Sequence, residues 1–198
     1  MAARADGAGV RLVLLGPPNS GKGTQARAVA ERLGVPAVST GDMLRLAVAE
    51  GSELGRRVGS ILDAGELVDD ATMADLVRER LGRPDTSGGF LLDGYPRTAG
   101  QAVTLREILT AREEELTAVL LLEVAEEALV ERGRGRGRAD DDVEVLRERL
   151  RVYREQTAPL IGYYSGLGLL RKIDGDRPIE EVTSHIFAAL GVETVAGA

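Results

Sequence analysis

The sequence predicts an α/β fold, a three-layer sandwich in which helices cover both faces of a central parallel five-stranded sheet. Short apolar runs typical of buried strands alternate with segments of helical periodicity along the whole chain. The first run is followed at once by a glycine-rich turn, and a later run ends on the acidic residue Asp93. Strands that alternate with helices form parallel βαβ units, and ligands bind such sheets at their carboxyl edge.

Each element follows from its pattern and its punctuation by glycine or proline. Runs rich in Val, Leu and Ile predict strands at 11–15, 35–38, 90–93, 118–123 and 169–173. Apolar residues three and four apart predict helices at 21–33, 40–50, 54–64, 71–81, 98–111, 125–132 and 179–190, and a long helix from about 143 that Pro159 bends or ends. The segments 40–81 and 133–141 fit poorly as simple crossovers, so we interpret both as insertions over the carboxyl edge of the sheet.

Composition narrows the class of protein. The 198 residues suffice for a full core, and a chain without cysteine has neither disulfides nor a thiolate metal site. The net charge of −7 argues against a large nucleic-acid surface, but local arginines still suit small phosphate ligands. Neither a membrane span nor a signal region is evident, so we expect a cytoplasmic protein.

The glycine-rich turn GPPNSGKGT, residues 16–24, is the strongest motif and is called the phosphate loop below. It lies between a strand and a helix and carries the G-x-x-x-x-G-K core of a phosphate-binding loop. Backbone N–H groups and the helix amino end attract phosphate oxygens, Lys22 adds a full charge, and Thr24 can ligate Mg²⁺. Asn19 is unusual within it, and the sequence leaves open whether its side chain contacts phosphate or fills space.

Several further motifs occur in an ordered series. They are STGDMLR at 39–45, DAGELV at 63–68, FLLDGYPR at 90–97, GRADD at 137–141, RERLRVY at 147–153, which contains Arg149, and TAPLIGYY at 157–164. Together with the phosphate loop they resemble the adenylate kinase family of nucleoside monophosphate kinases, from about residue 11 to residue 190. The resemblance implies one phosphate-loop kinase domain over 10–191, with a helical nucleoside monophosphate-binding insertion at 39–68 and a short lid at 135–141. Residues 1–9 and 192–198 are expected to be loose termini.

The resemblance also implies roles for particular residues. ATP would be bound by Asn19, Ser20, Gly21, Lys22, Gly23, Thr24, Arg132, Arg136 and Arg177. AMP would be bound by Thr40, Arg45, Glu66, Leu67, Val68, Gly94, Tyr95, Pro96, Arg97, Gln101, Arg138 and Arg149. The catalytic set would be Lys22, Arg97, Arg132, Arg138 and Arg149, with Mg²⁺ near Thr24 and Asp93, largely through water. No zinc is expected, and the family implies a monomer.

The reaction that the resemblance implies is the reversible conversion of ATP and AMP into two ADP. A phosphate monoester is mostly ionised at neutral pH, so no general base is required, and we interpret His185 as a structural or surface residue. Three alternatives remain: a kinase of another nucleoside monophosphate, a nucleotide-binding regulatory module without turnover, and an Arg-Gly nucleic-acid segment at 134–138.

Overall fold

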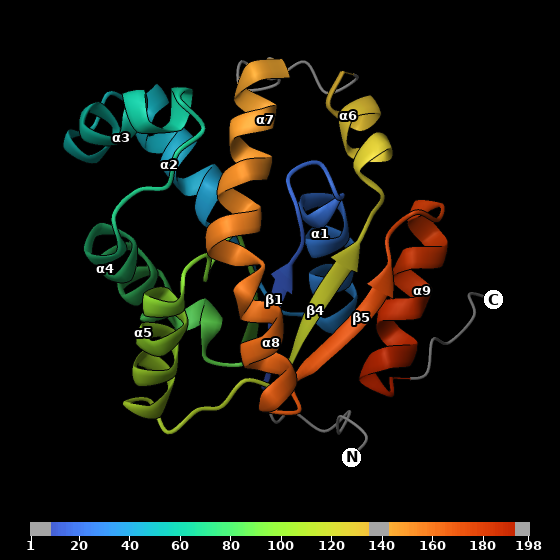
Figure 1. Cartoon of the computed structure of the whole chain (residues 1–198). Coiled ribbons are helices and arrows are strands. Elements are labelled where there is room, and N and C mark those ends of the chain that lie inside the picture. Colours follow the sequence, from blue (N-terminus) through green and yellow to red (C-terminus); the bar gives the residue numbers. More distant parts are fainter. Residues whose placement is uncertain (1–8, 135–142, 193–198) are drawn as a thin grey trace.

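A central parallel sheet organises the chain. The computed structural model describes residues 9–134 and 143–192. Its sheet has the strand order β2-β3-β1-β4-β5, and each pair of neighbouring strands is parallel. The strands are β1 (Val10–Leu15), β2 (Ala37–Ser39), β3 (Gly89–Asp93), β4 (Ala118–Glu123) and β5 (Leu170–Asp174). The expected α/β class is therefore confirmed, and β1 lies at the centre of the sheet (Figure 1).

Helices connect these strands. They are α1 (Lys22–Leu33), α2 (Thr40–Ala49), α3 (Glu53–Asp63), α4 (Asp70–Leu81), α5 (Ala99–Thr110), α6 (Glu126–Arg134), α7 (Val143–Val152), α8 (Pro159–Gly166) and α9 (Ile179–Leu190). A short 3₁₀ helix covers Pro84–Thr86 and a π-helical segment covers Tyr153–Thr157. Figure 1 shows α2 and α3 standing beside the upper part of α7, away from the strands.

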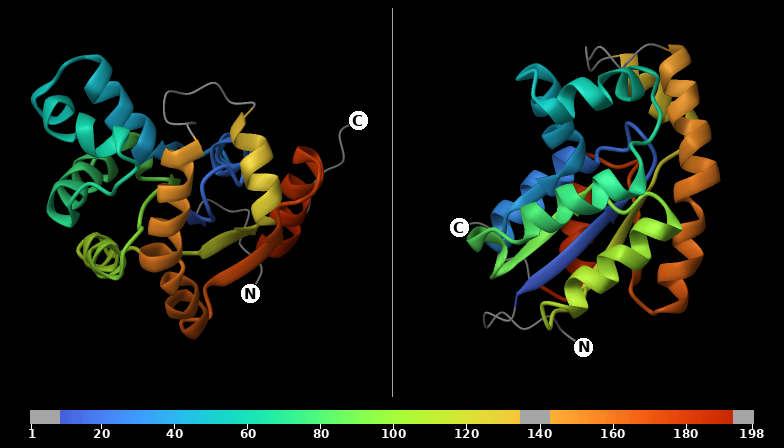
Figure 2. Two further views of the ribbon diagram at one scale, coloured as in Figure 1. Left: turned by 45° about the horizontal axis from the view of Figure 1, so that its top comes forward. Right: turned by 90° about the vertical axis from the view of Figure 1, so that its left-hand side faces the viewer.

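The two faces of the sheet bury different helices, because successive strand residues point to opposite sides. Val13 and Leu15 of β1 pack in one cluster with residues of α2, α4, α5 and α8. Leu12 and Leu14 pack in a second cluster with α1 and α9. Figure 2 shows this three-layer arrangement from two further directions.

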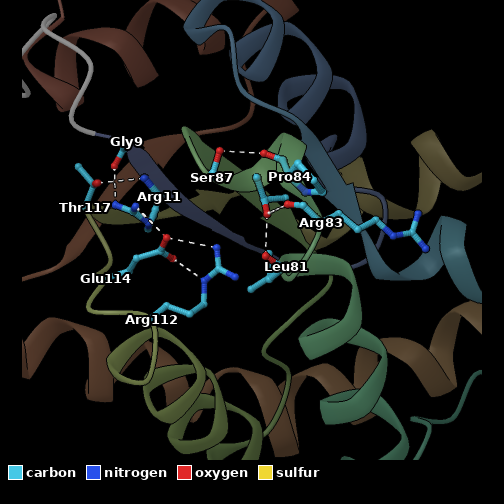
Figure 3. Close-up of polar contacts among 10 residues, drawn as sticks. Gly9, Arg11, Leu81, Arg83, Pro84, Ser87, Arg112, Glu114 and Thr117 are labelled. Atoms are coloured by element: carbon cyan, nitrogen blue, oxygen red, sulfur yellow. Dashed lines mark hydrogen bonds and ion pairs between the residues drawn. The ribbon is translucent and has the colours of Figure 1, made fainter.

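The amino ends of the strands are closed by polar contacts. Arg11 at the start of β1 pairs with Glu114 at 3.1 Å, and Arg112 Nε donates to the same carboxylate at 2.9 Å (Figure 3). Although partial burial opposes ionisation, the hydrogen bonds from Arg112 and Arg11 hold the pKa of Glu114 below its usual range. The opposite, carboxyl edge is where the cavities described below open.

Helix starts on the insertion side are fixed by local side chains. Ser39, Ser52, Asp69 and Thr98 accept hydrogen bonds from the first turns of α2, α3, α4 and α5. Helix α1 differs, since Gly21 precedes it and no side chain caps it in the part of the chain that the structure describes. Its amino end is therefore available to an anion.

The observed elements follow the expected ones with small differences. The second strand begins at Ala37 rather than 35, since Pro36 has no N–H to donate to a ladder. Helix α6 continues to Arg134, and the long helix expected from 143 is divided by the π-helical segment before Pro159. No helix in the two described ranges is long and apolar enough to cross a membrane. The expected lid at 135–141 lies outside the described residues.

Candidate active site

The phosphate loop is built on residues with positive φ. Gly16, Asn19 and Gly21 have φ angles of 150°, 63° and 91°, values that let consecutive backbone N–H groups turn toward one side. A side chain on Gly16 would collide with the loop, because a Cβ there would lie 2.9 Å from Ser20 Oγ and 3.0 Å from the Leu122 carbonyl oxygen. The loop thus needs glycine at this position in order to close tightly over β1.

Lys22 is the first residue of α1, and its side chain reaches back across the phosphate loop. Its Nζ donates to the carbonyl oxygens of Gly16 at 2.7 Å and Pro17 at 2.8 Å. These contacts hold the ammonium group beside the loop and the amino end of α1. The result is a full positive charge next to a partial one, which is an arrangement suited to phosphate.

A cavity of about 660 Å³ opens over the phosphate loop. It is lined by Asn19, Ser20, Gly21, Lys22, Gly23 and Thr24, and by the predicted ATP ligands Arg132 and Arg177. The structure therefore brings together every described residue of the predicted ATP set. Arg132 reaches it from α6, with Nη2 donating to the Gly175 carbonyl oxygen at 2.9 Å and Nη1 to that of Ser20 at 3.5 Å.

A second cavity of about 300 Å³ lies under α2 and α3. Most of the predicted AMP set lines it, namely Thr40, Arg45, Glu66, Leu67, Val68, Gly94, Arg97, Gln101 and Arg149. The remaining lining is largely apolar and comes from Leu44, Val48, Leu62 and Met73. An apolar chamber with a charged end suits a ligand that has a base at one end and a phosphate at the other.

The two cavities meet at a group of arginines. Arg45, Arg97 and Arg149 line both cavities, together with Gly41 and Gly94. We call these three side chains the shared arginines. They come from α2, the β3–α5 connection and α7, so three separate parts of the chain supply positive charge to one place.

Arg97 is held by two hydrogen bonds, one from its side chain and one to its backbone. Its Nε donates to the Gly94 carbonyl oxygen at 2.8 Å, and its own carbonyl oxygen accepts from Thr157 Oγ1 at 2.9 Å. Burial lowers the pKa of the Arg97 guanidinium, and the carboxylate of Asp93 opposes that shift. Because the ordinary pKa of arginine exceeds about 12, the side chain stays charged at neutral pH.

Gly94 makes this geometry possible. It has a φ of 84°, and a Cβ there would lie 2.8 Å from Thr40 Oγ1 and 3.0 Å from Arg97 Nη2. A glycine is therefore required where these two predicted AMP ligands approach each other.

Gln101 has a fixed amide orientation. Its Oε1 accepts from the backbone N–H of Arg97 at 2.7 Å, and its Nε2 donates to Asp70 Oδ1 at 2.9 Å. The donor N–H of Arg97 and the acceptor carboxylate of Asp70 allow only this assignment of the amide. The sequence did not predict Asp70 as part of the site. Asp70 lines neither cavity, and its contribution is to orient the amide of Gln101.

Thr24 and Asp93 fit the magnesium position expected from the sequence. Both line the larger cavity, and a Cβ on Gly23 would lie 3.6 Å from Asp93 Oδ2. The carboxylate is thus close to the start of α1, and oxygen ligands of this kind suit Mg²⁺. Within the described residues there is no cluster of three or more acidic or histidine side chains that could hold a metal alone.

Four predicted site residues line neither of these two cavities or lie outside the described residues. The Tyr95 side chain is fully buried in the core and lines neither cavity, so its ring is not exposed to a ligand in either of them. Arg136 and Arg138 lie outside the described residues. Pro96 lines a third, small cavity of about 60 Å³ between the other two, beside Lys22, Arg97 and Arg149.

Other lining residues were missed by sequence reasoning. Gln25 Nε2 donates to the Ile179 carbonyl oxygen at 2.9 Å, and Thr183 Oγ1 donates to Gln25 Oε1 at 2.8 Å. This network joins α1 to α9 and places exposed Ile179 at the wall of the larger cavity. The only sequence signal was the polar Gln25 on the apolar face of a helix.

His185 is exposed on α9, as expected for a surface residue.

Comparison with known proteins shows to which family of phosphate-loop proteins the chain belongs. The family model described as "Adenylate kinase" matches residues 14–169 of this chain. The chain belongs to the adenylate kinase family. It is 49% identical over 187 residues to the adenylate kinases of Brucella ovis and Brucella suis biovar 1, an overlap that covers 89% of this chain and 96% of each relative. The adenylate kinase of Brucella melitensis biotype 1 has the same identity and coverage.

Membership of the adenylate kinase family makes this chain an enzyme, a nucleoside monophosphate kinase, as the sequence predicted. The matched range 14–169 begins in β1 and includes the phosphate loop, both insertions and the shared arginines. The predicted site residues, with the exception of Arg177, therefore lie within the part of the chain on which the family assignment depends.

Proposed function

We propose that this enzyme transfers the γ-phosphoryl group of ATP to AMP, reversibly, giving two molecules of ADP. The supporting observation is the pair of cavities that meet at the shared arginines, Arg45, Arg97 and Arg149. A site for two nucleotides with one charged junction suits a transfer between their phosphates. Relatives 49% identical are adenylate kinases, which supports adenine nucleotides as the substrates.

ATP is assigned to the larger cavity. The phosphate loop, Lys22 and the open amino end of α1 lie there and would bind the phosphate chain. Gly175, Arg177 and Ile179 form the distant wall, where the adenine would lie. Among the lid residues, Arg136 and Arg138 stay predicted ligands, because they lie outside the described residues.

AMP is assigned to the smaller cavity. Its apolar wall, with Leu44, Val48 and Met73, would receive the base, and Thr40 and Gln101 would bind the polar edge. The phosphate would then point toward the shared arginines and ATP. In this orientation the attacking oxygen of AMP and the γ-phosphorus of ATP would meet at the junction of the two cavities.

Catalysis in this proposal is mainly electrostatic. The AMP phosphate is already ionised at neutral pH, so the chain need not remove a proton. Lys22, the shared arginines and Arg132 would neutralise the charge on the equatorial oxygens of the transferring group. Guanidinium groups suit this task, because they bind phosphate through two parallel hydrogen bonds and keep their proton.

Mg²⁺ is the cofactor that the residues present would accommodate. Thr24 would hold it near the phosphates, and Asp93 would orient its water ligands. When bound, the ion supplies charge neutralisation at the β- and γ-phosphates. The chain contributes the placement of these two oxygen ligands beside the phosphate loop.

The test is a coupled assay that measures ADP formed from ATP and AMP, with UMP, CMP and GMP as alternative acceptors at the same enzyme concentration. We expect AMP to be strongly preferred, and we expect Lys22→Ala to abolish most of the activity. Equal turnover with UMP or CMP would instead indicate another nucleoside monophosphate kinase. Nucleotide binding without turnover would indicate a regulatory module.

The proposal also includes a monomer as the active form, which is the state that the family resemblance implies. Light scattering coupled to gel filtration measures this directly. A dimer at assay concentration would contradict it.

A further inference from the structure

Asn19 occupies a position in the phosphate loop that glycine would fill with less strain. Its φ is 63°, in the left-handed region, and within the described residues only Glu113, with φ of 56°, shares this property among non-glycine residues. Glycine supplies such a backbone at no steric cost. The side chain of Asn19 therefore needs an explanation beyond the shape of the loop.

That side chain is directed at helix α6. Asn19 is 6% exposed, and its Nδ2 donates to the Leu129 carbonyl oxygen at 3.2 Å. The hydrogen bond is buried and joins residues 110 positions apart in the sequence. It connects the phosphate loop to the middle of the helix that carries Arg132.

Arg132 makes the return contact. From one helical turn further along α6, its Nη1 donates to the Ser20 carbonyl oxygen at 3.5 Å, and its Nη2 to the Gly175 carbonyl oxygen at 2.9 Å. The loop and the helix are thus joined by two hydrogen bonds, one from Asn19 to Leu129 and one from Arg132 to Ser20. The second bond comes from a guanidinium that lines the larger cavity.

Gly133 shows how closely the two elements approach. A Cβ at this position would lie 2.6 Å from Asn19 Nδ2 and 3.2 Å from Leu146 Cδ2. The first distance is too short for a carbon and a nitrogen, whereas the end of a leucine side chain can move by a few tenths of an ångström. The amide at position 19 therefore depends on glycine at position 133.

We propose that Asn19 is a positioning residue that holds α6, and with it Arg132, against the phosphate loop. The contact between Asn19 and α6 stands on the structure alone. Its catalytic consequence rests on the proposed function, in which Arg132 acts on the transferring phosphoryl group. Asn19 would act through this helix, by fixing where Arg132 lies.

The first experiment measures the contact without any assay of function. Gly133→Ala is introduced into the wild-type chain and into the Asn19→Gly chain, and the Tm of all four proteins is compared. In the wild type we expect the added methyl group to lower Tm by roughly 3–8 °C, as overpacking does. In the Asn19→Gly chain we expect at most about a third of that decrease, because the obstructing amide is gone.

The second experiment measures positioning. We expect Asn19→Gly to lower kcat roughly 5-fold, the effect of losing one buried neutral hydrogen bond, and to change the KM for AMP by less than about 2-fold. In an Arg132→Ala background the same substitution should lower kcat by less than about 2-fold, since it acts through that residue.

Glu113→Gly is the matched control. It removes a side chain at the second left-handed non-glycine position of the described residues, in the exposed turn after α5, and Glu113 lines neither cavity. We expect its kcat to stay within about 2-fold of the wild type. This control separates the loss of the Asn19 side chain from the general effect of a new glycine.

Each adverse outcome has one meaning. An equal decrease in Tm in both backgrounds would overturn the contact between Asn19 and α6. Full kcat in Asn19→Gly, or an undiminished 5-fold effect without Arg132, would overturn the positioning role. A wild-type chain that makes no ADP would overturn the proposed function and the catalytic part of this inference, whereas the Tm comparison would still decide the contact.

Discussion

At the scale of single residues, Arg97 lines both cavities. Its Nε donates to the Gly94 carbonyl oxygen and orients the guanidinium, and the Thr157 hydroxyl holds the Arg97 backbone through its carbonyl oxygen. We expect Arg97→Ala to lower kcat at least about 100-fold, because a charge at the transferring group would be lost. Steady-state ADP formation at saturating ATP and AMP measures this.

Arg78→Ala is a suitable control for Arg97→Ala. Arg78 is exposed on α4 and pairs with Asp75 at 2.7 Å, away from the described cavities. We expect nearly normal kcat, since an exposed ion pair contributes at most about 1 kcal/mol to stability. Near-normal turnover in Arg97→Ala would disprove the role given to the shared arginines.

Tyr95 gives a prediction about pH. Burial and the nearby carboxylate of Asp70 raise its pKa to about 12 from the ordinary value of 10.0. Between about pH 10 and 12 the unfolded chain loses this proton while the folded chain keeps it, so the free energy of unfolding falls as pH rises. Tyr95→Phe should reduce that fall by up to about 2 kcal/mol, measured by denaturant unfolding at several pH values.

The same variant tests the position of the ring. Within the described residues the Tyr95 hydroxyl is buried without a hydrogen-bond partner, so Tyr95→Phe should not lower stability at pH 7. The KM for AMP should also stay unchanged, because the ring lies in the core. A several-fold rise in this KM would show that the hydroxyl serves the nucleotide after all.

Residue types were predictable where a motif carries the chemistry, and side-chain directions were not. The glycines, Lys22 and Thr24 of the phosphate loop follow from strand–turn–helix context alone. In contrast, the partners of Asn19 and Gln101 lie 110 and 31 positions away in the sequence. No periodicity reports such contacts, because they depend on how distant elements pack.

At the scale of elements, the packing of α2 against α3 controls the smaller cavity. Gly55 of α3 is buried against the end of α2, and a Cβ there would overlap the Ala47 carbonyl group and lie 2.6 Å from the Val48 nitrogen. We expect Gly55→Ala to lower Tm by roughly 3–8 °C through overpacking. It should also raise the KM for AMP, since Arg45 and Val48 of α2 line that cavity.

Gly59→Ala, one turn further along the same helix, is the matched control for stability. The nearest atoms to a Cβ there are the Val48 methyl groups at 4.0 Å, an ordinary contact. Alanine favours a helix interior over glycine by up to about 1 kcal/mol, so Tm should stay the same or rise. A similar loss of Tm in both variants would show that the tight approach at Gly55 is not the cause.

Element type and order were predictable, because apolar period and glycine punctuation survive in a single sequence. The π-helical segment was not, since apolar spacing and glycine or proline punctuation mark a helix but do not tell a single π turn from an α turn. That segment places Thr157 so that its hydroxyl reaches the Arg97 carbonyl oxygen. An irregular turn thus has a local function that its sequence does not reveal.

At the scale of the whole molecule, charge is distributed unevenly. The chain has a net charge of −7, yet Arg27, Arg45, Arg97, Arg132, Arg149 and Arg177 gather around one cavity. Salt screens such a local field. We expect the KM values for ATP and AMP to rise several-fold between about 50 and 300 mM NaCl at constant free Mg²⁺. Sucrose at matched osmolality should leave both values unchanged, and a KM insensitive to salt would contradict this account.

Arg45, Arg97 and Arg149 are the basic residues that line the smaller cavity within the described chain, and all three also line the larger one, so a nucleotide in the smaller cavity shares every one of these cations with its partner. In the proposed reaction, selection that changes the affinity for AMP through these arginines is therefore expected to change the affinity for ATP as well. Mutations that change the affinity for a single nucleotide are expected at apolar residues that line only one cavity. Ile179 lines the larger cavity and Met73 lines the smaller one.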